Sequence, residues 1–193
     1  MLNSKHIFEE ASILNRCRKS EARAQKLLFE HFAPKMLGIC VRYVKDRSEA
    51  EHIMVGGMVK VLSKIDRYTA AGSLEGWIRR IMVNECLMYL KKNKVVFMEV
   101  HLENRGDIVD VSFFDTYDAE VLMLMIRSLP IGYRTVFNLY AIDGYSHAEI
   151  AKTLNIEINT SKSQLSRARA LLQKKLSVLT NNQAPRTKNH EII

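Results

Sequence analysis

Residues 144–170 read GYSHAEIAKTLNIEINTSKSQLSRARA and indicate a pair of helices in the last third of the chain. Ser146 and Glu149 form a capping box, in which the serine side chain accepts from the amide of Glu149 and the glutamate side chain reaches back. Asn155 tolerates the left-handed conformation that a tight turn after this helix needs. Two amphipathic helices joined by such a turn are typical of a helix-turn-helix, whose second helix enters the major groove of DNA.

The second helix of this pair has one face for a core and another for DNA. A helical wheel of residues 160–175 places small and apolar side chains on the core face: Ser161, Leu165, Ala168 and Leu172. Side chains able to hydrogen-bond base edges point roughly the other way: Thr160, Ser163, Gln164 and Arg167. Basic side chains at the flanks and in later turns are expected to contact phosphates: Lys162, Arg169, Lys174 and Lys175. The alternative, an ordinary basic surface helix that ends a bundle, is disfavoured by the capped helix and polar turn before it.

The composition bounds the class of protein. The chain has 193 residues, of which 47% are hydrophobic, and a formal net charge of +8, which suits a polyanionic partner, either nucleic acid or an acidic membrane surface. No apolar run approaches the roughly 20 residues of a membrane span, and residues 1–17 contain no signal-peptide core. We therefore expect a soluble, cytoplasmic protein. The cysteines at 17, 40 and 86 are far apart, so neither a disulfide framework nor a zinc site is expected.

Hydrophobic side chains recur mainly with the helical period, and strand signals are sparse, which predicts an all-α fold. In the first half, the pattern predicts a helix over 21–32 that Pro34 stops, and another over 35–44. Ser48 and Glu51 are interpreted as a capping box that opens a helix to about residue 64. A further helix is predicted after Ser73, to about residue 94.

The chain is predicted to contain two small helical domains. Residues 95–120 carry seven acidic residues and one basic one, and we interpret this local sign reversal as a flexible acidic linker. The domains would then span 1–94 and 121–179, and the polar tail 180–193 is expected to be frayed. A surface loop within one domain is the alternative reading of 95–120. In the second domain, helices are predicted over 121–129 and from Pro130 onward.

The other informative stretch is Arg67–Asn84, a loop of aromatic and small residues that leads into a basic helix. Aromatic rings beside cations suit single-stranded nucleic acid, because bases stack on rings while lysine and arginine contact the backbone. Trp77 stands at helical spacing, so it is expected to belong to the core, and a stacking role is the second interpretation.

Together the two basic segments resemble bacterial RNA polymerase sigma factors of the extracytoplasmic-function (ECF) group of the sigma-70 family. The resemblance is carried by GSLEGWIRRIMVN at 72–84, LPIGYRTVF at 129–137 and TSKSQLSRAR at 160–169, in a version like that common in Bacteroidetes. It implies a region 2 domain that opens the −10 element and a region 4 domain that holds the −35 element. It also implies the RNA polymerase core and promoter DNA as partners, and an anti-sigma factor as a further one.

The resemblance implies roles by position. The loop from Tyr68 to Ser73 would receive a flipped base, and the −10 contacts would be Tyr68, Ser73, Arg79, Arg80, Asn84 and Lys91. The −35 element would be contacted by Thr160, Lys162, Ser163, Gln164, Arg167 and Arg169. The helix over 48–63 would dock on the clamp helices of the polymerase large subunit through Glu49, His52, Val55, Gly56 and Val59.

The docking helix departs from the family pattern. An acidic residue is usual at the position of His52, glutamine at Val55, glutamate at Gly56 and an aromatic at Met58. Two adjacent glycines, at 56 and 57, also weaken a helix by about 1 kcal/mol each relative to alanine. The hypothesis is that this chain binds the polymerase core more weakly than its relatives, or through altered contacts.

No catalytic constellation, cofactor motif or metal-ligand spacing stands out, so the chain is expected not to be an enzyme and to bind no cofactor or metal. Two alternatives to a sigma factor stay open. One is a helix-turn-helix regulator that binds a palindromic operator without polymerase. The other is a degenerate sigma factor that serves only to bind an anti-sigma partner.

Overall fold

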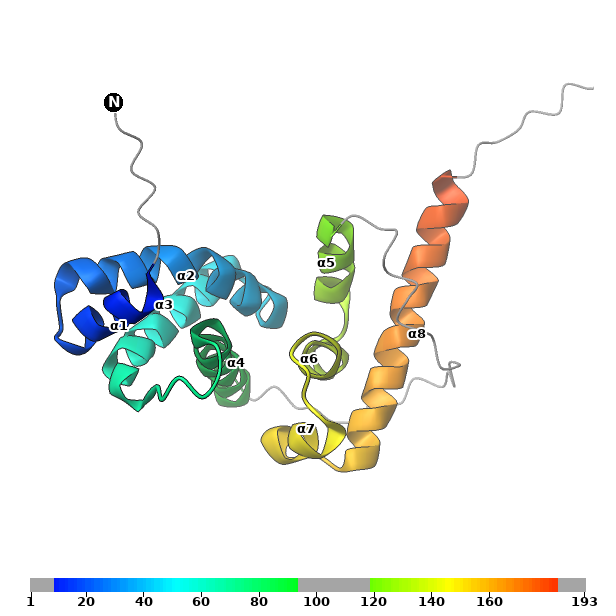
Figure 1. Ribbon diagram of the computed structural model, residues 1–193. Helices are drawn as coiled ribbons and strands as arrows, with labels where there is room; N and C mark the ends of the chain where they lie inside the picture. The colour runs from blue at the N-terminus through cyan, green and yellow to red at the C-terminus, as the bar shows by residue number, and fades with distance from the viewer. Residues whose placement is uncertain (1–8, 94–118, 184–193) are drawn as a thin grey trace, which may run out of the picture. The chain divides into compact units, whose positions relative to one another are not determined.

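The structure is a computed structural model, and it describes residues 9–93 and 119–183. Across these two ranges the regular elements are helices and no strand is present, which confirms the predicted all-α class. The chain divides between residues 95 and 96 into two compact units, called unit 1 and unit 2 (Figure 1). Residues 95–118 of the predicted linker and 184–193 of the predicted tail lie outside the described residues.

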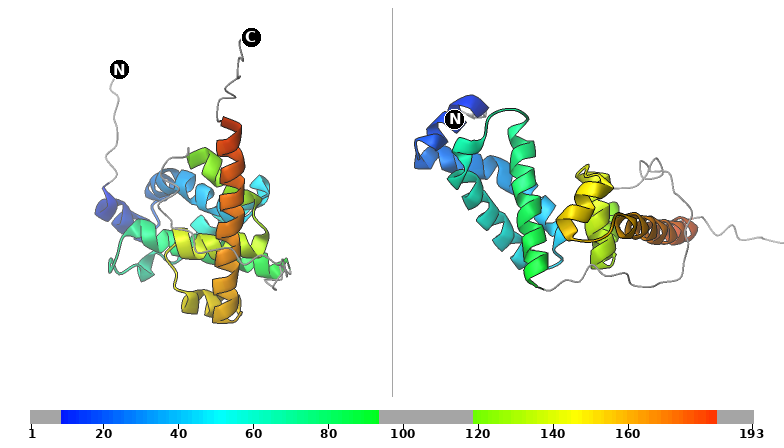
Figure 2. Two further views of the ribbon diagram at one scale, coloured as in Figure 1. Left: turned by 90° about the vertical axis from the view of Figure 1, so that its right-hand side faces the viewer. Right: turned by 90° about the horizontal axis from the view of Figure 1, so that it is seen from below.

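Unit 1 is built from α1 (Glu10–Arg18), α2 (Ala22–Tyr43), α3 (Arg47–Ser63) and α4 (Leu74–Lys92), with a short 3₁₀ turn, η1 (Ile65–Arg67), after α3. The helices α2, α3 and α4 pack against one another, and α1 packs on α2 and η1 (Figure 2). The core contains four buried methionines together with aliphatic and aromatic side chains. The three cysteines at 17, 40 and 86 are free and buried, as small hydrophobic residues in the core.

The predicted break at Pro34 is wrong, because α2 continues through it from Ala22 to Tyr43. A proline inside a helix removes one backbone hydrogen bond and costs about 3 kcal/mol or more. Its neighbours Phe32, Ala33 and Met36 are all buried in unit 1. Their burial offsets the cost of the proline, and this packing is not visible in the local sequence.

The predicted cap of α3 is also wrong. The helix starts at Arg47, and its cap is Asp46, whose carboxylate accepts a hydrogen bond from the amide of Glu49 at 2.9 Å. Glu51 does not reach back to Ser48 but accepts from Arg47 at 3.0 Å, one helical turn away. Because aspartate and serine are equally good caps, the two sites could not be ranked from sequence.

An Asp46→Ala substitution is expected to lower the free energy of unfolding of unit 1 by about 1 kcal/mol, because the amide of Glu49 loses its partner. The matched substitution Ser48→Ala is expected to change it by less than about 0.5 kcal/mol. The chain has a single tryptophan, Trp77 in unit 1, so denaturant unfolding followed by its fluorescence reports this unit alone. Equal losses for the two variants would contradict the assignment of the cap.

Unit 2 contains α5 (Ala119–Ser128), α6 (Ile131–Phe137), a π-helical turn η3 (Asn138–Ile142), α7 (His147–Leu154) and α8 (Ile158–Gln183). Each of α5, α6 and α7 packs against α8, which is 26 residues long (Figure 2). The helix α8 thus extends four residues beyond the domain end expected at 179. Its long packed face explains why three short helices can form one unit.

The turn between α7 and α8 has the predicted chemistry. Ser146 and Glu149 form the complete capping box at the start of α7. Asn155 ends this helix in the left-handed conformation, with φ of 57°.

The buried side chain of Arg134 joins α6 to α5. It donates a hydrogen bond to the backbone carbonyl of Arg127 at 3.0 Å, so this carbonyl at the C-terminal end of α5 has a partner. In residues 9–93 and 119–183, no helix has both the length and the hydrophobicity that crossing a membrane requires.

Candidate nucleic-acid interface

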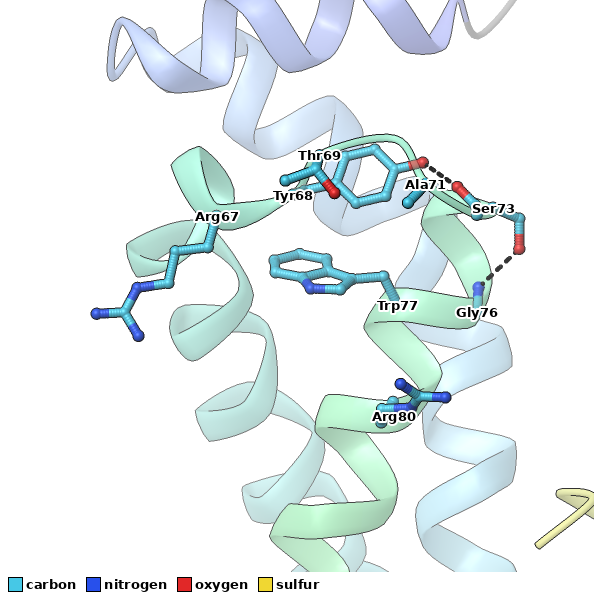
Figure 3. Close-up of a pocket in the computed structure, with 9 residues that line it drawn as sticks. Arg67, Tyr68, Thr69, Ala71, Ser73, Gly76, Trp77 and Arg80 are labelled. Atoms are coloured by element: carbon cyan, nitrogen blue, oxygen red, sulfur yellow. Dashed lines mark hydrogen bonds between the residues drawn. The ribbon is translucent and has the colours of Figure 1, made fainter.

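The loop between η1 and α4 borders a cavity of about 390 Å³ (Figure 3). Ser73 caps α4 by accepting from the amide of Gly76 at 3.1 Å, and this fixes the end of the loop. The hydroxyl of Tyr68 donates to the carbonyl of Gly72 at 2.6 Å and closes the loop on itself. The cavity is lined by Arg67, Tyr68, Thr69, Ala71, Gly72, Ser73, Gly76, Trp77 and Arg80. Its volume lies within the range of pockets that bind small organic groups.

Two aromatic rings form the wall of this cavity. The rings of Tyr68 and Trp77 lie 5.5 Å apart between centroids, at a tilt of 44°. Tyr68 is 6% exposed, and burial raises the pKa of its hydroxyl, with a further contribution from the nearby carboxylate of Glu10. Trp77 is only half-buried and lines the cavity, so the expectation that it belongs to the core is wrong. Its indole lies beside the loop and offers a surface on which a base can stack (Figure 3).

The helix α1 is hydrogen-bonded to the loop. The guanidinium of Arg18 donates to the backbone carbonyl of Tyr68 at 3.0 Å. Ala70 has φ of 58°, a left-handed conformation that is strained for a residue with a side chain. Such a residue persists where the surrounding contacts over-determine the backbone, and the bond from Arg18 is one such contact.

The predicted −10 residues of α4 divide between two sides of the helix. Arg80, Asn84 and Lys91 are exposed, and their spacing of four and seven residues places them along one stripe that starts at the cavity. Arg79 is half-buried and does not line the cavity. It lies near Glu75, whose pKa is lowered mainly by the ammonium of Lys35 at 2.7 Å and to a smaller extent by Arg79. Thr69 and Ala71 belong to the loop that was predicted to receive a base, and both line the cavity; Arg67, just before that loop, lines it too and was not predicted.

The predicted −35 residues lie in the first turns of α8. Lys162 is exposed, and the side chains of Thr160, Ser163, Arg167 and Arg169 are half-buried. Ser163 donates to the carbonyl of Thr160 at 3.0 Å. The core face predicted by the helical wheel is confirmed, since its four side chains are at most 4% exposed: Ser161, Leu165, Ala168 and Leu172.

Gln164 is the exception, because its side chain is fully buried instead of facing a groove. It lies against α6 at Gly132, where a β-carbon would stand 3.2 Å from the amide oxygen of Gln164. The glycine leaves the space that this amide occupies. Gln164 stands three residues after Ser161 and four before Ala168, so its spacing already placed it beside the core face. Gln164 was nevertheless predicted to contact DNA, because a glutamine side chain can hydrogen-bond a base edge.

A cluster of side chains that was not predicted from the sequence lies beside the N-terminal half of α8. Tyr140 of η3 stacks on the ring of His147, with centroids 4.5 Å apart and ring planes 23° apart. Nδ1 of His147 and Oγ of Ser161 form a hydrogen bond of 2.9 Å. The guanidinium of Arg169 lies 5.8 Å from the centroid of the Tyr140 ring. We call these four residues the Tyr140 cluster.

Burial lowers the pKa of His147, and the cations Lys162 and Arg169 lower it further. The unfolded chain therefore binds a proton at higher pH than the folded one, and unit 2 should lose stability as the pH falls below the ordinary histidine value of about 6.5. Amide hydrogen exchange in α7 and α8 is expected to speed up between pH 7.5 and 5, after correction for intrinsic exchange. In the His147→Gln variant this pH dependence should be weaker, and an unchanged dependence would contradict the assignment.

The predicted docking residues of α3 are all exposed: Glu49, His52, Val55, Gly56 and Val59. Val55 and Val59 are 47% and 62% exposed, so the face carries unusually accessible apolar side chains. The neighbouring Gly57 is buried, and a β-carbon there would stand 2.5 Å from the sulfur of Met82 in α4. Within the described ranges, no group of three or more histidine, cysteine or acidic side chains is arranged to hold a metal ion.

Comparison with known families agrees with this geometry. Residues 28–95 match the family Sigma-70 region 2, and residues 119–172 match Sigma-70, region 4. The first match contains the loop, the cavity and most of unit 1. The second contains α5 to α7 and the first half of α8. The two matches together span well over half of the chain.

Whole sequences match as well. The chain is 26% identical to the RNA polymerase sigma-H factor of Pseudomonas aeruginosa, over 89% of this chain and 95% of that protein. It is 23% identical to the ECF RNA polymerase sigma-E factor of Haemophilus influenzae, over 88% and 96%. The fold is similar to that of the sigma factor RpoE from Bartonella quintana, solved in complex with the anti-sigma factor NepR. That similarity has a TM-score of 0.50 and 22% identity, and covers 79% of this chain and 96% of that one. This chain belongs to the sigma-70 family, as an RNA polymerase sigma factor of the ECF group.

Proposed function

We propose that the protein is a dissociable promoter-specificity subunit, which brings the RNA polymerase core to promoters and helps to open the −10 duplex. The observation that carries the proposal is the cavity of unit 1, where a loop and a half-buried tryptophan lie beside exposed cations. A flipped base needs a stacking surface and a nearby phosphate contact, and this site offers both. The helix-turn-helix of unit 2 supplies the second contact with the promoter.

The site residues are assigned on the same basis. In unit 1, Tyr68 and Ser73 shape the cavity. Along α4, the DNA strand is contacted by Arg80, Asn84 and Lys91. Arg79 lies on another side of α4 and makes a smaller contribution. In unit 2, Thr160, Ser163 and Arg167 contact base edges, whereas Lys162 and Arg169 contact phosphates. The buried side chain of Gln164 packs between α8 and α6 and is not assigned a DNA contact. Each unit binds DNA modestly, and attachment of both to one polymerase raises the effective concentration of each.

We further propose that the protein is not an enzyme and works in the cytoplasm, where its polymerase and promoters are. The exposed face of α3 would dock on the clamp helices of the polymerase large subunit. An anti-sigma factor is a further candidate partner, because the related RpoE was solved with one.

Run-off transcription with purified polymerase core tests this function. Transcript 5′ ends mapped in cells that overproduce the protein would identify promoters, and the strongest would serve as template. Core with the protein should produce a discrete transcript that core alone does not, and its formation should fall steeply with salt. DNA protection by the protein alone, with no transcript, would instead support a polymerase-independent regulator. Neither transcript nor protection would support a protein that only binds an anti-sigma partner.

The docking face yields a prediction of its own. The double variant Val55→Gln, Gly56→Glu restores side chains usual in relatives, and glutamate at position 56 also removes a helix cost of up to about 1 kcal/mol. We expect it to bind the polymerase core about threefold more tightly than the wild type, as measured by competition for core. Gly56 has open space around it, so the larger side chain should not disturb the fold. Equal affinities would show that the exposed valines dock as well as the usual polar side chains.

A further inference from the structure

The Tyr140 cluster lies in unit 2 and joins three elements around the start of α8. Tyr140 comes from η3, His147 from the first turn of α7, and Ser161 and Arg169 from α8. None of the predicted roles of the helix-turn-helix uses Tyr140 or His147. Two of the four side chains nevertheless come from the helix that enters the groove, so the cluster can affect how that helix presents its cations.

A π-helical turn places Tyr140 in this cluster. The amide of Asp143 donates to the carbonyl of Asn138 at 2.9 Å, five residues back, instead of four as in an α-helix. The extra residue rotates the side chains that follow, relative to an uninterrupted α6. Asn138 and Leu139 remain buried in unit 2, whereas Tyr140 is 37% exposed. Turns of this kind occur frequently at functional sites.

The ring of Tyr140 contacts two side chains, His147 and Arg169. His147 stacks on it at 4.5 Å, and His147 is in turn hydrogen-bonded to Ser161, whose side chain is fully buried. The guanidinium of Arg169 lies over the ring at 5.8 Å, within the range of a cation–π interaction. The ring is therefore in contact with both side chains, and it provides an attractive surface for the long side chain of Arg169.

We infer that Tyr140 is a positioning residue, which holds the guanidinium of Arg169 in place for contact with a promoter phosphate. The inference rests on the proposed function and deepens its −35 site. Arginine loses much rotamer freedom when it binds, and a side chain already held over a ring loses less. Tyr140 thereby raises promoter affinity without contact with DNA, and the stack with His147 keeps its ring at the angle that Arg169 needs.

A double-mutant cycle in the complete holoenzyme tests the inference. Promoter affinity and its salt dependence are measured for the wild type, Tyr140→Leu, Arg169→Ala and the double variant. Arg169→Ala should weaken binding about fivefold and reduce the salt slope by about one, because one phosphate contact is lost. Tyr140→Leu should weaken binding about threefold. In the double variant, the affinity should equal that of Arg169→Ala alone, since Tyr140 acts only through Arg169.

Two further variants keep the test sharp. Tyr140→Phe retains the ring and should bind within a factor of two of the wild type. Tyr140→Leu combined with Lys162→Ala is the matched control, because Lys162 is exposed on the same helix and no ring contact joins it to Tyr140. There the two losses should multiply. A general folding defect of Tyr140→Leu would multiply in both backgrounds and would overturn the inference, as would a phenylalanine variant as weak as the leucine one.

The failure of the proposed function has a different signature. A wild-type holoenzyme that gives no protein-dependent transcript would overturn the function and the inference together. A wild-type holoenzyme that transcribes, with independent effects of Tyr140 and Arg169, would overturn the inference alone.

Discussion

A Trp77→Ala substitution is expected to reduce promoter opening about tenfold or more, with little change in binding to the −35 element. Trp77 is half-buried and forms a wall of the cavity in unit 1. The stacking of one base on an aromatic side chain contributes about 1–3 kcal/mol, and 1.4 kcal/mol corresponds to a factor of ten. Permanganate reactivity of −10 thymines in the holoenzyme complex measures the opening, and protection of the −35 region measures the binding.

Two controls separate stacking from stability. Trp77→Phe keeps a smaller ring and should retain most of the opening. Glu30→Ala removes an exposed side chain of α2, away from the cavity and from the stripe of α4, and should leave opening unchanged. If Trp77→Ala opened promoters normally, or if Trp77→Phe were equally defective, the indole would have no stacking role in opening. Equal loss of −35 protection would instead indicate a loss of fold.

A Gly57→Val substitution is expected to lower the free energy of unfolding of unit 1 by about 1–3 kcal/mol. A β-carbon at this position would stand 2.5 Å from the sulfur of Met82 and 2.7 Å from its terminal methyl carbon. The contacted atoms are the flexible end of Met82, but Met82 is fully buried between packed helices and valine is stiff, so a change of rotamer must displace core neighbours. Overpacking of this kind costs about 1–3 kcal/mol. Denaturant unfolding followed by the fluorescence of Trp77 measures the loss.

The adjacent glycine provides the matched control. Gly56 is exposed, and nothing lies within 4 Å of a β-carbon built there. Gly56→Ala should therefore raise the free energy of unfolding, by up to about 1 kcal/mol, because alanine favours the helix. Opposite signs for two neighbouring glycines would confirm that close approach of α3 and α4 requires only the second. An increase for both variants would show that helix propensity alone governs this segment.

The elements that the sequence predicted best depend on interactions within a few residues. The capping box of Ser146 and Glu149, the cap at Ser73 and the left-handed Asn155 are all present. The two caps each join a side chain and a backbone amide three residues apart, and the third feature depends on the backbone preference of Asn155 itself, so the local sequence contains all that is needed. The core face of α8 was predicted for the same reason, since helical spacing alone places its four side chains together.

Apart from the cap of α3, where two equally good local candidates competed, the errors concern distant neighbours. Pro34 does not end α2, because the surrounding helix is held in the core of unit 1. Gln164 is buried, because Gly132 of another helix leaves room for it. Trp77 lines a cavity because the loop around Tyr68 folds over it. The Tyr140 cluster was not predicted at all, since its members come from three elements and its π-helical turn has no short-range signal.

The helical class, the two basic segments and the helix-turn-helix could be predicted from the amino-acid sequence, because periodicity, caps and net charge are properties of short windows. Which polar side chains face solvent and which belong to the core became clear from the packing of the helices. The same packing brings a loop, a helix start and a tryptophan together around one cavity. The physical reason is that burial and side-chain contact depend on the space left by residues far away along the chain, and no local pattern contains that information.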